Sequence, residues 1–221
     1  MHTEAMGPDL RALIALLSEG GIVIVVLALL SLLMLTIIFA KIIQFRRLRV
    51  GDRSFVEPML TAWRRGDARR AKASLEGKRN PLAAMLRQVI DPPADIAADQ
   101  RDIDLERQAR STLAGLDRHL GVLDSIATLS PLLGLFGTVL GMIEAFQAMQ
   151  AAGGRIEPGM LAGGISTALV TTAAGLAVAI PASAAFSWFE GRLDALRHDM
   201  EDAIGRALSY RGTANDVQAA T

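Results

Sequence analysis

Three long apolar stretches interrupt an otherwise polar chain. No Asp, Glu, Lys or Arg occurs in residues 20–40, 125–143 and 158–189, which are 21, 19 and 32 residues long. A helix needs about 20 apolar residues to cross the hydrocarbon core of a bilayer. The pattern therefore predicts an all-α integral membrane protein with three transmembrane helices.

The basic residues predict the orientation of these helices. Residues 41–124 contain 17 of the 23 Lys and Arg, and four more follow residue 189, whereas residues 1–19 and 148–157 contain one each. Lys and Arg are enriched in cytoplasmic loops. The N-terminus is therefore expected outside and the C-terminus in the cytoplasm. The first apolar stretch is longer than the apolar core of a signal peptide, so we expect it to remain as an anchor.

Seven consecutive segments follow from this topology. They are an outer N-terminal segment (1–19), the first transmembrane helix (20–43), a cytoplasmic helical region (44–122), the second transmembrane helix (123–147), a short outer loop (148–157), the third transmembrane helix (158–189), and a cytoplasmic C-terminal helix and tail (190–221). We expect the second and third helices to extend into the cytoplasm, and residues 212–221 to form a disordered tail.

Helix start and stop signals divide the cytoplasmic region. Gly66 and Gly77 are typical of helix ends, Asp67 and Asn80 of N-caps, and Pro81 of a first helical position. Further along, leucines repeat at helical spacing with no helix breaker before residue 131, which predicts one long helix over about residues 95–150.

Small residues gather on one face of the second and third apolar stretches. On the second, the stripe includes Gly134, Gly137, Thr138 and Gly141. On the third, it includes Gly164, Thr171 and Gly175, with Thr167 and Thr172 on its flanks, and Pro181 is expected to kink the helix. Such stripes allow close packing of helices. The hydroxyl groups could also pass ions or water without a buried charge.

Two motifs on these stripes resemble the signature helices of the MotA/TolQ/ExbB proton-channel family. They are Gly134-Leu-Phe-Gly-Thr-Val-Leu-Gly141 and Ala168-Leu-Val-Thr-Thr-Ala-Ala-Gly-Leu-Ala-Val-Ala-Ile-Pro181. The order of segments from about residue 15 to 210 is similar as well. Three transmembrane helices make the chain resemble ExbB and TolQ more than the four-helix MotA.

This resemblance implies a role in a proton-driven motor of the bacterial inner membrane, with the N-terminus in the periplasm. A homo-pentamer would surround a dimer of an ExbD/TolR-like single-span protein, whose aspartate takes and releases the proton. The motor would energise a periplasm-spanning TonB- or TolA-like protein. The family's ring threonines match Thr138 and Thr172. Thr171, on the stripe, and Thr167 are the further candidates for the ion pathway.

One position departs from the family pattern. Thr167 stands where ExbB and TolQ typically carry a glutamate, which leaves a hydroxyl-lined site that could also serve sodium. A MotA-like sodium-driven subunit therefore stays open, as does a non-conducting scaffold whose small stripes only pack helices. The choice between a TonB-linked and a Tol-linked system also stays open.

Other function classes lack the residues that they need. The chain has no cysteine, which excludes disulfides, thiolate metal sites and a cysteine nucleophile. His2, His119 and His198 have no metal-ligand spacing, and neither a phosphate-binding loop nor a serine-hydrolase elbow occurs. We therefore expect no enzyme, cofactor or metal. The net charge is zero, and the basic residues at 64–78 are expected to face anionic lipid or water rather than nucleic acid.

Overall fold

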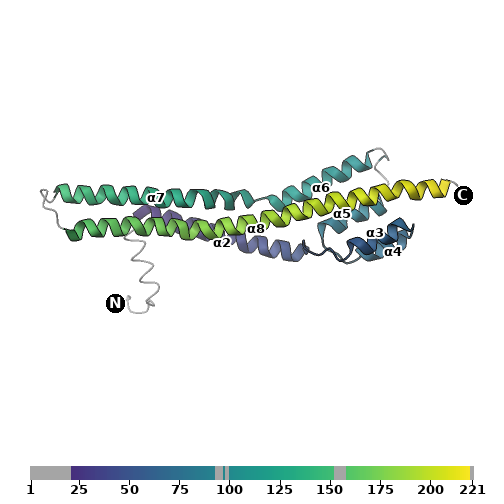
Figure 1. The fold of residues 1–221 in the computed structure, drawn as a ribbon, viewed down its shortest axis with the longest axis horizontal. Coiled ribbons are helices and arrows are strands. Elements are labelled where there is room, and N and C mark those ends of the chain that lie inside the picture. Colours follow the sequence, from purple (N-terminus) through teal and green to yellow (C-terminus); the bar gives the residue numbers. More distant parts are fainter. Residues whose placement is uncertain (1–20, 93–96, 98–99, 152–157, 220–221) are drawn as a thin grey trace, which may run out of the picture. The chain divides into compact units, whose positions relative to one another are not determined.

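Helices make up most of the chain that the structure describes. The computed structural model describes residues 21–92, 97, 100–151 and 158–219, and none of these residues lies in a strand. The helices are α2 (Gly21–Leu48), α3 (Val56–Arg64), α4 (Ala68–Leu75), α5 (Pro81–Ile90), α6 (Arg101–Asp117), α7 (Leu120–Ala151) and α8 (Pro158–Ala219) (Figure 1). Three helical segments, Gly21–Leu48, Arg101–Ala151 and Ala162–Tyr210, are long and apolar enough to cross a membrane. The all-α prediction with three membrane-spanning helices is confirmed.

The chain divides into two compact units. The apolar unit comprises the described residues of Met1–Phe39 and His119–Ser187, and the polar unit comprises those of Ala40–Arg118 and Trp188–Thr221. In the apolar unit, large side chains such as Leu132, Phe136 and Leu169 are more than half exposed. Such a surface is suited to contact with lipid.

The short helices of the polar unit begin and end as the sequence predicts. The Asp67 carboxylate accepts a hydrogen bond from the Arg70 amide at 2.9 Å, and the Asn80 side-chain oxygen accepts one from the Leu82 amide at 2.9 Å. Gly66 and Gly77 adopt positive φ angles of 78° and 68°, which other residues rarely adopt. These local signals act within a few residues, so the sequence alone was sufficient to find them.

Within the polar unit, side chains from α2 and α3 contact the last part of α8. The rings of Phe45 and Phe189 lie 5.3 Å apart in an edge-to-face arrangement, and Phe189 is almost fully buried. The Trp63 indole donates to the carbonyl oxygen of Ala207 at 2.9 Å. Arg206 pairs with Glu57 at 2.7 Å, and its hydrogen bond lowers the pKa of Glu57.

The expected long helix over residues 95–150 is interrupted, so that prediction was wrong. α6 ends at Asp117 and α7 begins at Leu120, because His119 adopts a φ of 73°. The break leaves the Leu116 carbonyl without the amide that would bond to it in a continuous helix. The Nζ of Lys41, from α2, donates to this oxygen at 2.5 Å, and the lysine is only 4% exposed.

The third apolar helix continues far beyond the apolar stretch. α8 is 62 residues long and contains Pro181 without ending there. It extends to Ala219, so the tail that we expected from residue 212 is helical through most of its length. Any kink at Pro181 stays a prediction.

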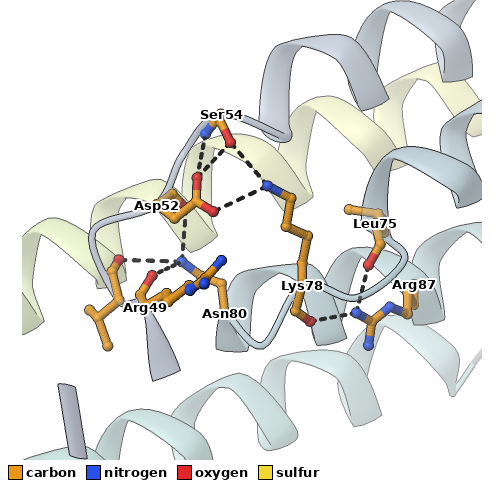
Figure 2. A network of polar contacts seen from close by, with 8 residues as sticks. Arg49, Asp52, Ser54, Leu75, Lys78, Asn80 and Arg87 are labelled. Atoms are coloured by element: carbon orange, nitrogen blue, oxygen red, sulfur yellow. Dashed lines mark hydrogen bonds and ion pairs between the residues drawn. The ribbon is translucent and has the colours of Figure 1, made fainter. Parts of the chain in front are cut away.

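Asn80 joins the chain that leaves α2 to the start of α5. Its Nδ2 donates to the carbonyl oxygens of Arg49, Val50 and Asp52 at 3.0, 3.3 and 2.9 Å, and the residue is 3% exposed (Figure 2). Lys78, two residues earlier, pairs with the Asp52 carboxylate at 3.2 Å. One side chain therefore both caps a helix and fixes the turn after α2.

We predict that Asn80→Asp will destabilise the polar unit although it keeps the N-cap acceptor. The carboxylate has no N–H to donate to the three carbonyls, so the cost should be about 2 kcal/mol or more, in the range for buried groups that lose their partners. Thermal unfolding of the purified protein in detergent measures this. Asp67→Asn is the matched control, because Asp67 acts as a cap acceptor, and it should change the midpoint little. Equal effects of the two substitutions would contradict the joining role of Asn80.

The Asp52 carboxyl should make stability depend on pH. Hydrogen bonds from Ser54, together with Lys78, lower its pKa from 3.8 to about 2. The stabilisation is therefore fully present above the unfolded pKa and is lost as the pH falls through the folded pKa. Between pH 6 and pH 2, the unfolding midpoint should fall less in Asp52→Asn than in the wild type. An equal decrease of the unfolding midpoint in both proteins would show that the Asp52 carboxylate does not contribute to stability.

Candidate functional site

The small stripes of α7 and α8 face each other in an antiparallel contact within the apolar unit. A methyl group added at Gly175 would lie 2.5 Å from the carbonyl oxygen of Ser130, and one added at Gly134 would lie 2.9 Å from that of Thr171. Real side chains essentially never come so close to backbone atoms. The two helix backbones therefore touch directly at these glycines.

The remaining glycines of the motifs lie along the same contact. A methyl group at Gly137 would lie 2.7 Å from the Thr171 side chain, and one at Gly141 would lie 3.4 Å from that of Ala168. Gly164 packs against Ala145. All five glycines that the sequence singled out thus meet the other helix of the same chain, which is the geometry of small-residue helix packing.

Thr171 lies inside this contact. It is 2% exposed, and its hydroxyl donates to the carbonyl oxygen of Ala168, one turn earlier, at 2.7 Å. The same hydroxyl lies 3.3 Å from the Gly134 carbonyl oxygen on α7. A side chain enclosed in this way supports helix packing more than it supports the lining of an ion pathway.

Thr138 and Thr172 are half-buried, and their hydroxyls donate to two different backbone carbonyls of α7. The Thr172 hydroxyl donates to the Gly134 oxygen at 3.3 Å, across the two helices. In a regular α-helix, the same oxygen accepts the amide of residue 138. The Thr138 hydroxyl itself donates to the Leu135 carbonyl at 2.6 Å. Thr172 therefore joins the two helices at Gly134, whereas the Thr138 hydroxyl bonds within its own helix.

Three further polar or special residues lie on these helices. Thr167 is half-buried and precedes Thr171 by one helical turn. Pro181 is exposed. The Ser130 hydroxyl is fully buried and has no hydrogen-bond partner among the described residues. Ser130 lies one helical turn before Gly134 on α7.

The arrangement offers neutral dipoles and no charge. The second and third apolar stretches contain no acidic or basic side chain. Within the part of the chain that the structure describes, no three His, Asp or Glu side chains gather as a metal site. Hydroxyl and carbonyl oxygens at Gly134 can solvate a passing ion or water, but they cannot bind and release a proton at neutral pH.

Sequence reasoning missed two buried polar residues of the polar unit. It counted Lys41 only among the basic residues of 41–124 and treated Asn80 only as a helix cap. Their partners lie 75 residues away at Leu116 and about 30 residues away at Arg49 and Val50. The chain gave a weak signal for Lys41, because it directly follows the first apolar stretch and continues the same helix.

A family model supports the resemblance found in the motifs. The model of the MotA/TolQ/ExbB proton channel family matches residues 77–202, which include both motifs and more than half of the chain.

The chain is also similar to curated proteins that are named ExbB or TolQ. The chain is 40% identical over 114 residues to the biopolymer transport protein exbB1 of Vibrio cholerae serotype O1, covering 48% of this chain and 50% of that protein. It is 35% identical over 113 residues to the Tol-Pal system protein TolQ of Haemophilus influenzae, covering 51% and 48%. It is 30% identical over 162 residues to the putative biopolymer transport protein ExbB-like 3 of a Synechocystis strain, covering 73% and 77%. The chain thus spans about half the length of the first two relatives.

We predict that Gly175→Ala will destabilise the protein although alanine favours helices. The new methyl group would meet the Ser130 backbone oxygen, and overpacking of this kind costs about 1–3 kcal/mol. Gly163→Ala is the matched control on the same helix, because a methyl group there meets nothing within 4 Å. Thermal unfolding in detergent should show a lower midpoint for Gly175→Ala and an equal or higher midpoint for Gly163→Ala. The opposite order would refute direct backbone contact.

Proposed function

Because the chain belongs to the MotA/TolQ/ExbB proton channel family, we propose that it is an ExbB/TolQ-like subunit of a motor driven by proton flow. The observation that carries this proposal is that Thr172 of one motif donates across the helix contact to Gly134 of the other motif, on which Thr138 is also half-buried. Half-buried hydroxyls at this depth give an uncharged lining for an ion that crosses the bilayer. The motor would convert ion flow into mechanical work on a periplasm-spanning TonB- or TolA-type protein.

The proposed motor lies in a bacterial inner membrane, with the N-terminus in the periplasm and the C-terminus in the cytoplasm. This orientation places the polar unit in the cytoplasm. The distribution of Lys and Arg supports it, since 21 of the 23 basic residues fall in the segments assigned to that side.

The proton carrier in this proposal belongs to a partner. Several copies of the chain, a pentamer by resemblance, surround a dimer of an ExbD/TolR-like single-span protein that supplies a membrane aspartate. The uncharged apolar stretches of this chain support that division of roles. Each proton that crosses 100 mV supplies about 2.3 kcal/mol, so substantial pulling requires several protons.

Two alternatives remain, and each has an observation in its favour. Thr167 in place of the family glutamate supports a MotA-like sodium-driven subunit. The burial of Thr171 and of the glycine stripes supports a non-conducting scaffold, in which these residues serve packing alone. The threonine hydroxyls distinguish the alternatives, because a scaffold does not need them and an ion pathway does.

Thr138→Val should abolish partner-dependent ion flow and leave assembly intact, since valine keeps the shape of threonine and loses only the hydroxyl. The complex, co-purified with its membrane partner, would be placed in liposomes, and proton entry under a potassium diffusion potential would be followed with an internal pH dye. We expect a decrease of about tenfold or more, which corresponds to about 1.4 kcal/mol.

Thr36→Val is the control for this measurement. Its hydroxyl donates to the Leu32 carbonyl on an exposed face of α2, so the same chemical change should leave ion flow unaffected. Absence of ion flow in the wild-type complex would favour the scaffold, and normal flow in Thr138→Val would show that the pathway does not need this hydroxyl. Flow that follows a sodium gradient and not a proton gradient would favour the sodium-driven alternative.

A further inference from the structure

A groove in the polar unit lies between α6 and α8. Its volume is about 600 Å³, enough for several side chains. The floor is apolar and includes Leu105, Leu113, Met200, Ile204 and Leu208. Neither the ion pathway nor the packing of α7 on α8 uses this groove.

The rim of the groove carries excess negative charge. Asp102, Glu106 and Glu201 line it, with Arg110 and Arg197 as the basic members. Arg110 pairs with Glu106, and Arg197 pairs with Asp194. Among the described residues, Asp102 and Glu201 make no ion pair. The groove therefore suits an apolar side chain that is accompanied by a positive charge.

Ile103 is such a side chain, and it lies on the same chain. It is 68% exposed, and it is the one large apolar side chain exposed in the described polar unit outside the predicted transmembrane helices. Arg107, one helical turn later, pairs with Asp104 and keeps 74% of its side chain exposed. Together they present an apolar knob beside a guanidinium group.

Ile103 cannot fill the groove of its own chain. Successive residues of an α-helix are about 100° apart, so Ile103 lies about 160° around the α6 axis from Leu105 on the groove floor. Knob and groove are thus complementary surfaces on different faces of one molecule. Repeated head-to-tail contacts between such surfaces close into a ring when the rotation permits it.

We propose that the α6–α8 groove binds Ile103 of a neighbouring copy of this chain, with Arg107 of that copy beside Glu201. The contact is an interface between the polar units of successive subunits. It rests on the self-association contained in the proposed function and does not depend on ion conduction. The contact joins two different surfaces, which are Ile103 of one copy and the α6–α8 groove of the next.

Cysteine cross-linking tests this contact, and the chain is suited to it because it has no native cysteine. Two differently tagged full-length copies, one carrying Ile103→Cys and the other Ile204→Cys, would be co-expressed and treated in membranes with a short bismaleimide. We expect a cross-link between the two tags. The yield should exceed by about tenfold or more that of Ile103→Cys with Ala73→Cys, an exposed position on α4, because proximity raises the effective concentration.

Native mass spectrometry of the same samples separates this proposal from the proposed function. An oligomer without the Ile103–Ile204 cross-link would overturn the groove contact and leave self-association standing. A monomer without the cross-link would overturn both. Cross-links only between two Ile103→Cys copies would show a symmetric contact and refute the head-to-tail one. Capture of a different protein by Ile204→Cys alone would assign the groove to that protein and likewise overturn the proposal.

Discussion

The direct contact between the backbones of α7 and α8 is the constraint on which the rest of the apolar unit depends. It exists because Gly134 and Gly175 have no side chain at the point where the helices meet. The close approach brings the hydroxyl of Thr172 within reach of a carbonyl on the other helix. It also fixes the rotation of both helices, so bulky residues such as Phe136 and Leu169 face outward. The backbone contact between α7 and α8 therefore explains both the polar contact between the helices and the apolar surface on their outer faces.

The helices and much of the contact between them could be predicted from the sequence. A charge-free stretch of sufficient length predicts a helix that can cross the hydrocarbon core, and a small-residue stripe predicts which face can approach another helix. Both depend on residues close together in the chain. The caps at Asp67 and Asn80 were found for the same reason. The sequence could not show what each stripe packs against. In the structure, each stripe packs against the other stripe of the same chain.

The features that escaped prediction depend on distant residues. The break at His119 has no glycine or proline to announce it, and a carbonyl freed there is satisfied by Lys41 from another helix. The three carbonyls that Asn80 binds belong to a turn about 30 residues earlier. Neither pairing leaves a periodic pattern in the sequence. A lysine directly after an apolar stretch reads equally well as a charge in water or as a buried donor.

The α6–α7 junction and α8 differ in how their backbone hydrogen bonds continue. α8 is one helix of 62 residues, although Pro181 removes one amide donor from its ladder of backbone hydrogen bonds. Between α6 and α7 the ladder of backbone hydrogen bonds is interrupted at Arg118 and His119, where Lys41 supplies a donor to the Leu116 carbonyl. At the α6–α7 break a lysine side chain replaces the missing backbone donor, whereas at Pro181 the carbonyl oxygen of Ala177 loses its usual donor inside a helix that continues.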